Sequence, residues 1–319
     1  MTLQRLTDSV YAETGMHGCN LGFVTTSEGV VMIDTPQKPS DAVRWRDEIA
    51  KRGEVRYLIL TEPHPDHCTT GYLFSGTMIS HQGTREWLGK NILGKTVEEM
   101  AKEWSEVIDP EGVHLLEGYY LRLPTITFRG RLILYLGDHT FEIIHLPGHT
   151  SSQTAVYIPE ERVVFTGDNV FYRVQTWLNE AYPQEWLHSL ERIGELDVDV
   201  IVPGHGDVCD KSYLKEQASF IREWMCAVKR AFEQGLTKEE AQTQISFLDR
   251  YPMDTGLEAM GLTAQQLNVA RLYDLVLASQ PKLRLKMPSH DSLVLHLPVA
   301  ESSIVCNPEV KAPVRQRNT

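Results

Sequence analysis

The chain has 319 residues, of which 42% are hydrophobic, and its 31 Lys and Arg against 43 Asp and Glu give a formal net charge of -12. This length and apolar content exclude a disulfide-stapled mini-protein and a disordered chain, and they suit one large or two modest domains. A surface of this charge repels phosphate backbones and anionic lipid, so we expect neither a nucleic acid nor a membrane as partner.

The N-terminal residues and the cysteines indicate the compartment. Residues 1–6 lack the apolar stretch of a signal peptide, and the sequence contains no apolar run long enough to span a membrane. The five cysteines are odd in number and show no C-x-x-C spacing, which favours reduced thiols over a disulfide framework. We therefore expect a cytoplasmic protein.

The first part of the chain predicts short strands and one helix. Apolar runs within residues 8–35 alternate with turn signals and predict two or three strands. Residues 42–49 repeat apolar side chains at helical spacing after a capping signal, which predicts a helix. Residues 55–60 are largely apolar on both faces, as in a buried strand, and they lead directly into Thr61-Glu62-Pro63-His64-Pro65-Asp66-His67.

The middle of the chain repeats this arrangement of strands that end in polar loops. After a helical pattern at 94–107, residues 121–146 predict a second group of strands that ends at Leu146-Pro147-Gly148-His149. A strand pair at 154–158 and 163–165 ends at Thr166-Gly167-Asp168. A helix at 184–194 then precedes a strand at 199–202 that ends at Pro203-Gly204-His205-Gly206.

Beyond Asp210 the pattern becomes helical. Long apolar periodicities predict helices at 213–234, 238–244 and 264–278, followed by a short strand at 292–297 and a frayed tail at 307–319. We place a boundary near residue 210, between a sheet-rich domain over 1–210 and a helical extension over 211–319.

Polar clusters at four strand ends carry the chemical signal. Rigid strands can aim side chains from distant parts of a chain at one point, and metal sites are built in this way. Prolines stiffen the first cluster and glycines flank two of the histidines, where the backbone must turn sharply. The clusters contain Glu62, His64, Asp66, His67, His149, Asp168 and His205.

With these motifs, residues 8 to 210 resemble the metallo-β-lactamase-fold metallohydrolases. The family pattern is an aspartate at an early strand end, a Thr-His-x-His-x-Asp-His loop, a Pro-Gly-His-Thr loop, a Thr-Gly-Asp strand end and a Pro-Gly-His-Gly loop. In the family's order it is matched by Asp34, Thr61 to His67, Pro147 to Thr150, Thr166 to Asp168 and Pro203 to Gly206. The resemblance implies an α/β (α+β) fold, an αββα sandwich with a C-terminal helical extension, and two divalent metal ions at one edge.

The resemblance also implies a ligand set by position. The first metal would be held by Glu62, His64 and His149, the second by Asp66, His67 and His205, and Asp168 would bridge them. Asp34 would orient the ligand loop without binding metal itself.

One position departs from the family pattern, because Glu62 stands where the family has its first histidine. A carboxylate is a harder ligand than imidazole and adds negative charge, which shifts the preferred metal from zinc toward iron or manganese. The flavodiiron branch of the family carries the related order His-x-Glu-x-Asp-His and uses two irons for oxygen or nitric oxide chemistry.

Three functions are consistent with these residues. The first is a dinuclear metal-dependent hydrolase of a small ester, thioester, lactone or amide, in which a metal-bridging hydroxide attacks and the catalytic Asp66 carries the proton. The alternative is a non-heme diiron oxygenase or oxidase with Glu62 as an iron ligand, although nothing after residue 210 resembles a flavodoxin domain. The third is a binding protein that kept the fold without its activity.

The substrate would be a small molecule, and weaker signals indicate its contacts. His17 lies on a loop that overhangs the metals in the family, while Arg173, Trp177 and Tyr182 follow Asp168 on a loop that lines the pocket. The helical extension would form a lid over the active-site edge. Its apolar periodicity at 264–278 suits a homodimer contact equally well.

Overall fold

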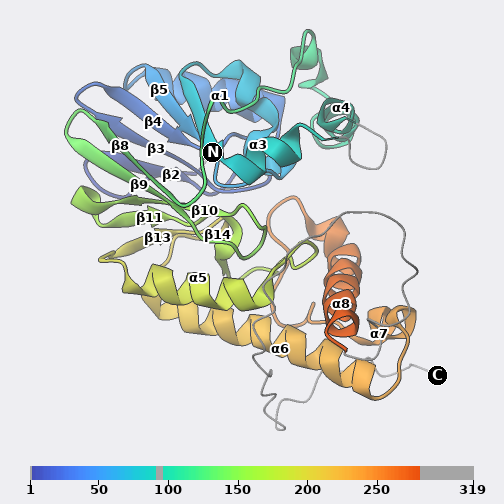
Figure 1. Cartoon of the computed structure of the whole chain (residues 1–319). Coiled ribbons are helices and arrows are strands. Elements are labelled where there is room, and N and C mark those ends of the chain that lie inside the picture. Colours follow the sequence, from blue (N-terminus) through green and yellow to red (C-terminus); the bar gives the residue numbers. More distant parts are fainter. Residues whose placement is uncertain (1, 91–95, 281–319) are drawn as a thin grey trace, which may run out of the picture.

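The protein is a sandwich of two β-sheets with helices on both outer faces (Figure 1), as the sequence predicts. The structure, a computed structural model, describes residues 2–90 and 96–280. The strand and the tail predicted at 292–297 and 307–319 lie outside the described residues.

The first sheet has seven strands in chain order, antiparallel from β1 to β4 and parallel from β4 to β7. Its strands are β1 (Leu3–Arg5), β2 (Val10–Glu13), β3 (Leu21–Thr26), β4 (Gly29–Ile33), β5 (Val55–Ile59), β6 (Thr77–His81) and β7 (Ile126–Phe128). The opening strands and the strand predicted at 55–60 are confirmed, whereas β1 and β6 were not predicted.

The second sheet has five strands in the order β13-β11-β10-β9-β8, and a separate parallel pair joins β12 to β14. The strands are β8 (Arg131–Leu136), β9 (His139–His145), β10 (Thr154–Ile158), β11 (Val163–Phe165), β12 (Phe171–Tyr172), β13 (Val200–Val202) and β14 (His205–Gly206).

The helices cover the outer faces and form the extension. Those of the sandwich are α1 (Pro39–Ala50), α2 (Pro65–Cys68), α3 (Gln82–Leu88), α4 (Val97–Ile108) and α5 (Pro183–Glu195). The extension contains α6 (Leu214–Glu233), α7 (Lys238–Gln244) and α8 (Gly261–Ala278), which confirm the three helices predicted there.

Side-chain alternation along the strands produces three layers of core. In β4, Val31 and Ile33 join the cluster between the two sheets, while Val30 and Met32 join the cluster beneath α1. In β10, Val156 and Ile158 face the other sheet, while Ala155 and Tyr157 face the helices on the far side. Successive side chains of a strand point to opposite faces, so a strand that is apolar throughout is buried on both faces.

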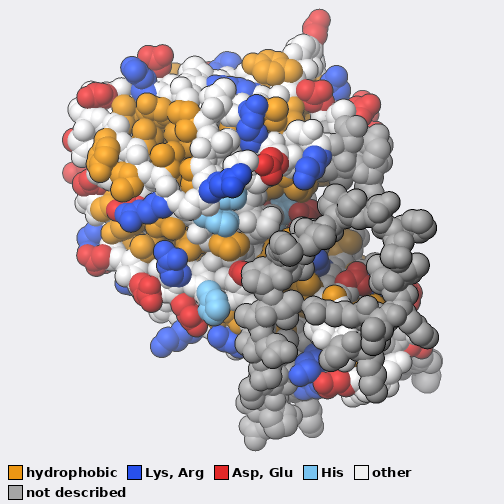
Figure 2. Space-filling view, in the orientation of Figure 1, with side chains coloured by type: hydrophobic (Ala, Val, Ile, Leu, Met, Phe, Trp, Pro, Cys, Tyr) orange, Lys and Arg blue, Asp and Glu red, His pale blue; other side chains and the backbone are white. Residues whose placement is uncertain are grey.

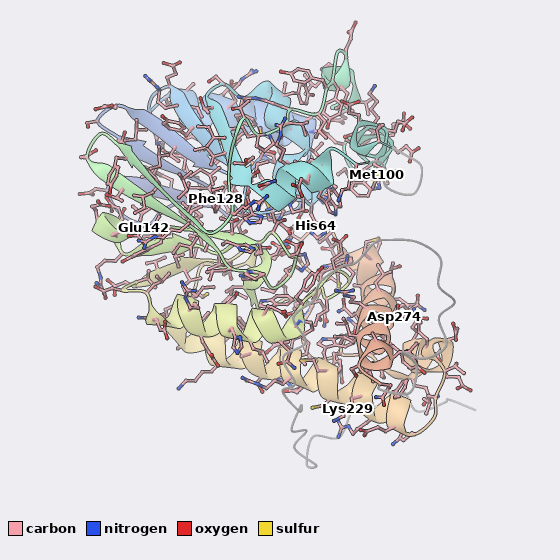
Figure 3. The ribbon with its side chains drawn as sticks, in the orientation of Figure 1. His64, Met100, Phe128, Glu142, Lys229 and Asp274 are labelled. Atoms are coloured by element: carbon pink, nitrogen blue, oxygen red, sulfur yellow. The ribbon has the colours of Figure 1, made fainter. Side chains whose placement is uncertain are left out.

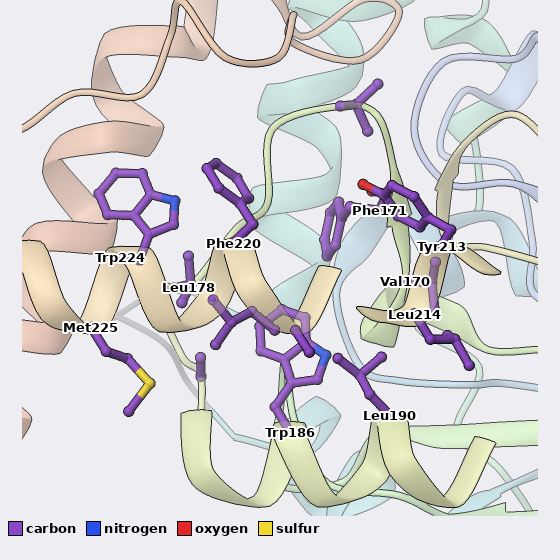
Figure 4. Packing of buried hydrophobic residues seen from close by; sticks show 14 of the residues in the cluster. Val170, Phe171, Leu178, Trp186, Leu190, Tyr213, Leu214, Phe220, Trp224 and Met225 are labelled. Atoms are coloured by element: carbon purple, nitrogen blue, oxygen red, sulfur yellow. The ribbon is translucent and has the colours of Figure 1, made fainter. Parts of the chain in front are cut away.

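The extension shares its core with the sandwich. One hydrophobic cluster contains Val164 of β11, Trp186 of α5 and Trp224 of α6. Figure 4 shows the two tryptophans within it. Trp224 and Met225 belong to the extension that was expected to form a lid, and both lie buried in this cluster. The boundary near residue 210 therefore marks a change in secondary structure across which the packing is continuous.

Within the residues that the structure describes, part of the outer face of the second sheet is exposed. β8 is an edge strand whose alternate residues point to solvent, with Tyr135 72% exposed and Ile133 41% exposed. Figure 2 shows hydrophobic side chains gathered over this region. The homodimer stays a prediction.

Two expectations about the chain as a whole can be compared with the structure. Among the described helices, none combines the length and the apolar character needed to cross a bilayer. Cys19, Cys68 and Cys209 are free thiols, but Cys226 is disulfide-bonded, so the expectation of reduced cysteines is wrong at that position. An odd number of cysteines leaves at least one thiol free and does not prevent a single bond.

A hydrogen-bonded cluster joins the two sheets at the end where β2 and β9 begin. His139 Nε2 lies 3.0 Å from Ser9 Oγ and 3.0 Å from Glu161 Oε1, and His139 Nδ1 lies 3.1 Å from Asp138 Oδ1. Burial lowers the pKa of His139, but the hydrogen bonds to Glu161 and Asp138 outweigh burial and raise it. The charged imidazole therefore stabilises the fold fully below its unfolded pKa of about 6.5. This stabilisation is lost as the pH rises through the raised folded value.

We predict that His139→Gln lowers the free energy of unfolding by about 1–3 kcal/mol near pH 6, because it removes hydrogen bonds made by a charged group. The difference from the wild type should shrink as the pH rises through the raised folded pKa of His139, above which the wild-type imidazole is also neutral. Urea denaturation across this range measures it, with His188→Gln on the exposed surface of α5 as control. If the difference in free energy of unfolding between His139→Gln and the wild type does not change with pH, His139 is not charged in the folded protein.

Candidate metal centre

The predicted clusters meet at one edge of the sandwich because several strands end there. β4 and β5 run parallel in the first sheet, and β9, β11 and β13 run in one direction in the second. The segments that follow β5, β9, β11 and β13 carry all seven predicted ligands, with Asp66 and His67 in α2 and His205 at the start of β14. In Figure 3, His64 lies between the sandwich, marked by Phe128, and the extension, marked by Asp274.

A first group of potential ligands consists of Glu62, His64 and His149. Glu62 Oε1 lies 2.9 Å from His64 Nδ1, and His149 Nε2 lies 3.1 Å from the same nitrogen. Pro63 and Pro65 flank His64, and their restricted backbone angles hold the loop before α2 extended.

A second group consists of His67, Asp168 and His205. Asp168 Oδ1 lies 3.1 Å from His67 Nε2, and Asp168 Oδ2 lies 3.3 Å from His205 Nε2. Asp66 adjoins this group, with its Oδ2 3.4 Å from His205 Nε2. Only glycine fits at position 204, because a Cβ there would lie 2.0 Å from Asp168 Oδ1.

Glu62 and Asp168 connect the two groups. Glu62 Oε1 lies 3.2 Å from His67 Nε2, and Asp168 Oδ2 lies 3.6 Å from His149 Nε2. Thus the carboxylate that replaces the expected histidine points inward, and one of its oxygens faces both groups.

Unsatisfied buried atoms show that this arrangement suits a cation. Glu62 Oε2, His67 Nε2 and Asp168 Oδ1 are buried without a hydrogen-bond partner. Buried polar atoms without partners are costly, and carboxylate oxygens and imidazole nitrogens are the donors that zinc, iron and manganese bind. The residues present therefore fit a pair of divalent metal ions.

The electrostatics of the cluster also favour positive charge. Burial raises the pKa of Asp66, but the neighbouring His67 and the hydrogen bond from His205 lower it to about 2. Burial lowers the pKa of His205, but Asp168 raises it well above its ordinary value. Carboxylates and imidazoles thus stabilise one another's charged forms, as expected where carboxylates are buried together.

Asp34 orients the second group from behind. Its Oδ2 accepts hydrogen bonds from Thr61 Oγ1 at 2.6 Å and from His67 Nδ1 at 3.0 Å, and its Oδ1 accepts one from the Thr61 N–H at 2.7 Å. A carboxylate only accepts, so His67 donates from Nδ1 and turns Nε2 toward Asp168. The family resemblance implied this orienting role for Asp34.

Three further contacts with the imidazoles were not predicted. Asp254 Oδ2 accepts a hydrogen bond from His205 Nδ1 at 2.8 Å. The Trp177 carbonyl accepts one from His149 Nδ1 at 2.8 Å, and Glu180 Oε1 lies 3.6 Å from His64 Nε2. Trp177 and Glu180 lie on the loop after Asp168, so their closeness in sequence to a predicted ligand could have indicated these contacts. No pattern in the sequence indicates a contact between Asp254 and a ligand.

The predicted substrate contacts have different surroundings. His17 is half-buried beside the extension, where a Cβ on Gly256 would lie 2.1 Å from its Nδ1. Trp177 contacts His149 through its backbone, as described above. Arg173 is exposed and lies over the Tyr172 ring, and Tyr182 stacks with Arg271 of α8. The contacts of Arg173 and Tyr182 are with neighbouring protein side chains.

Comparisons with known proteins agree with the geometry. A family model described as the metallo-beta-lactamase superfamily matches residues 14–205. The acyl-coenzyme A thioesterase MBLAC2 of Homo sapiens is 26% identical over 204 residues, covering 58% of this chain and 72% of that protein. A hydroxyacylglutathione hydrolase of Brucella ovis is 34% identical over 191 residues, covering 59% of each.

A solved structure gives the same fold. The metallo-beta-lactamase from Pontibacter korlensis aligns with a TM-score of 0.52 at 20% sequence identity, covering 69% of this chain and 98% of that chain. At this identity the likeness concerns the fold alone.

We predict that Asp34→Asn weakens metal binding by about 10–100-fold, the usual effect of losing a partner that orients a ligand. The amide would present its NH2 group toward donors that now face a carboxylate oxygen. Competition with a chromophoric chelator measures the affinity, and Asp47→Asn on the exposed face of α1 is the matched control. Equal affinities in both variants would contradict the orienting role.

Proposed function

Because the chain belongs to the metallo-beta-lactamase superfamily, we propose that it is a metal-dependent hydrolase of a small ester, thioester, lactone or amide. The observation that supports this most directly is the cluster of seven potential ligands at the sandwich edge, of which five are buried and His64 and Asp66 are partly exposed. Two relatives named above are a thioesterase and a hydroxyacylglutathione hydrolase, so thioesters are the first substrates to test.

The proposed ligand assignment follows the two groups. Glu62, His64 and His149 would hold one ion, His67, His205 and Asp66 the other, and Asp168 would contact both. When bound, such a pair supplies an acidified water as nucleophile and polarises the substrate carbonyl. Zinc is the ion expected for the fold, and the added carboxylate of Glu62 favours iron or manganese.

Asp66 is the proposed proton carrier. Its side chain is 19% exposed, whereas that of Asp168 is 5% exposed, so it is more open to water and substrate. His205 and His67 lie against its Oδ2 and hold it ionised at neutral pH, the form that accepts a proton. An ionised carboxylate beside the reacting water can take its proton and deliver it to the leaving group.

The substrate would approach beside His17 and His64. Burial and Lys38 lower the pKa of His17, so it is neutral near pH 7 and can donate or accept a hydrogen bond. Trp87 lies edge-on to His64, with ring centroids 5.9 Å apart, and offers an apolar surface to an acyl group. We propose His17 as a substrate contact on this basis. For Arg173, Trp177 and Tyr182 the proposal rests on the family resemblance.

Glu62 also favours a second candidate, a diiron oxygenase or oxidase. Glu62, Asp66 and Asp168 place three carboxylates among four imidazoles, a donor set that suits iron. Such an enzyme would need electrons from a partner or from its substrate.

We predict that the purified protein hydrolyses a panel of small thioesters without oxygen. Chelator treatment should abolish this activity, and a divalent metal should restore it. Elemental analysis of protein prepared without added metal, followed by assays with zinc, iron or manganese, identifies the working ion. Turnover that requires oxygen, in protein carrying about two irons per chain, would instead support the oxygenase.

We also predict that Asp66→Asn lowers kcat by at least about 100-fold, the usual effect of losing a general acid-base group. Because Asp66 is also a proposed ligand, metal content must be measured alongside the rate. Loss of rate with two metals retained supports the proton role, and loss of one metal supports ligation alone. Asp47→Asn, which changes the same charge on an exposed helix face, should match the wild type in both measurements.

A further inference from the structure

The loop between α7 and α8 reaches the metal centre from outside the segment shared with the family. Asp254 on this loop accepts the hydrogen bond from His205 Nδ1, although the two residues lie 49 positions apart. The family match ends at residue 205, so this carboxylate belongs wholly to the extension. Its side chain is 16% exposed and is therefore largely shielded from water.

The hydrogen bond decides which nitrogen of His205 is available to a metal. With Nδ1 donating to Asp254, Nε2 faces Asp168 and Asp66 and is the nitrogen that would give up its proton to bind a metal. A carboxylate partner also makes the imidazole more basic and holds the ring plane. Without Asp254, Nδ1 loses its acceptor, and no hydrogen bond from this side selects the tautomer.

Buried amides hold the Asp254 loop in place. The Gln175 N–H donates to the Pro252 carbonyl at 2.9 Å, and the Gln175 side chain donates to the Tyr251 carbonyl at 2.5 Å. Gln265 of α8 donates to Gln175 Oε1 at 3.0 Å. Gln175 and Gln265 are each 1% exposed, so these hydrogen bonds are shielded from water and resist exchange.

A second connection runs from α8 to His149. Asn268 accepts a hydrogen bond from the Leu178 N–H at 2.6 Å and donates one to the Thr176 carbonyl at 2.8 Å. These two contacts fix the backbone on either side of Trp177, whose carbonyl accepts from His149 Nδ1. Asn268 is fully buried, and both of its partners are backbone groups.

We propose that the helical extension completes the metal centre by positioning one histidine of each ligand group. Asp254 positions His205 directly, and Asn268 positions His149 through Trp177. Both are positioning residues, since neither lies among the proposed ligands. This inference rests on the proposed metal-dependent function and adds a role for residues beyond the family segment.

The first test uses Asp254→Ala and Asp254→Asn, with Asp249→Ala as the control. Asp249 lies five positions earlier in the same connection, is exposed and carries the same charge. Stepwise competition of Zn2+ with a chelator should show one of two ions bound about 10–100-fold more weakly in Asp254→Ala, with the other unchanged. Asp254→Asn keeps an acceptor of the same shape and should show a smaller loss.

A spectroscopic readout separates positioning from general destabilisation. Zn2+-loaded wild type and Asp249→Ala should show a downfield imidazole N–H proton resonance that Asp254→Ala lacks. A variant destabilised without loss of positioning would keep this resonance. If Asp254→Ala keeps the downfield imidazole N–H resonance and binds both Zn2+ ions with wild-type affinity, the proposed role of Asp254 is wrong.

The second test uses Asn268→Ala, with Asn268→Asp as the variant that keeps the acceptor for the Leu178 N–H. The inference expects Asn268→Ala and Asn268→Asp each to weaken the binding of one ion. It expects Asp254→Ala combined with Asn268→Ala to weaken the binding of both ions. If the double variant still holds one ion with wild-type affinity, the two residues act on the same site and the inference is wrong. A wild type that binds no metal refutes the proposed function itself, whereas two tightly bound ions unaffected by any of these variants refute only the inference.

Discussion

Several carboxylates are buried together at one edge of the sandwich. Glu62, Asp168 and Asp34 are all buried, and Asp34 accepts a hydrogen bond from His67 on the side away from Asp168. Carboxylates so close together repel one another and lose hydration, and only positive charge or donated hydrogen bonds can compensate. Imidazoles, hydroxyl and amide donors, and the proposed cations provide that compensation.

The two sheets fix the backbone positions from which these charged side chains extend. The ligands follow strands whose directions are fixed by two hydrogen-bonded sheets, so each loop starts from a rigid position. Glycine at position 204 admits the Asp168 carboxylate at a distance that no side chain would allow. Precision at the site therefore comes from elements whose own stability lies in the hydrophobic layers.

The sequence predicted the parts of the molecule that follow local rules. Strand ends, flanking glycines and histidine spacing located the seven clustered side chains, and apolar periodicity located the three described helices of the extension. β6 was not predicted, because its five residues are followed directly by a short helix and are too few to establish a strand periodicity. Asp254 was not predictable, because its partner is distant in sequence and an aspartate in a turn ordinarily only shapes the turn.

The cluster of Ser9, His139 and Glu161 has a consequence for how the molecule responds to acid and alkali. The sheets are joined by titratable groups at both ends, but with opposite chemistry. At the ligand end, imidazoles must shed protons before they can hold a cation, so acid loosens that closure. At the far end, His139 must keep its proton, so alkali loosens that one. The two ends of the sandwich are therefore expected to respond to pH in opposite directions: acid acts on the proposed metal centre, and alkali acts on the His139 cluster.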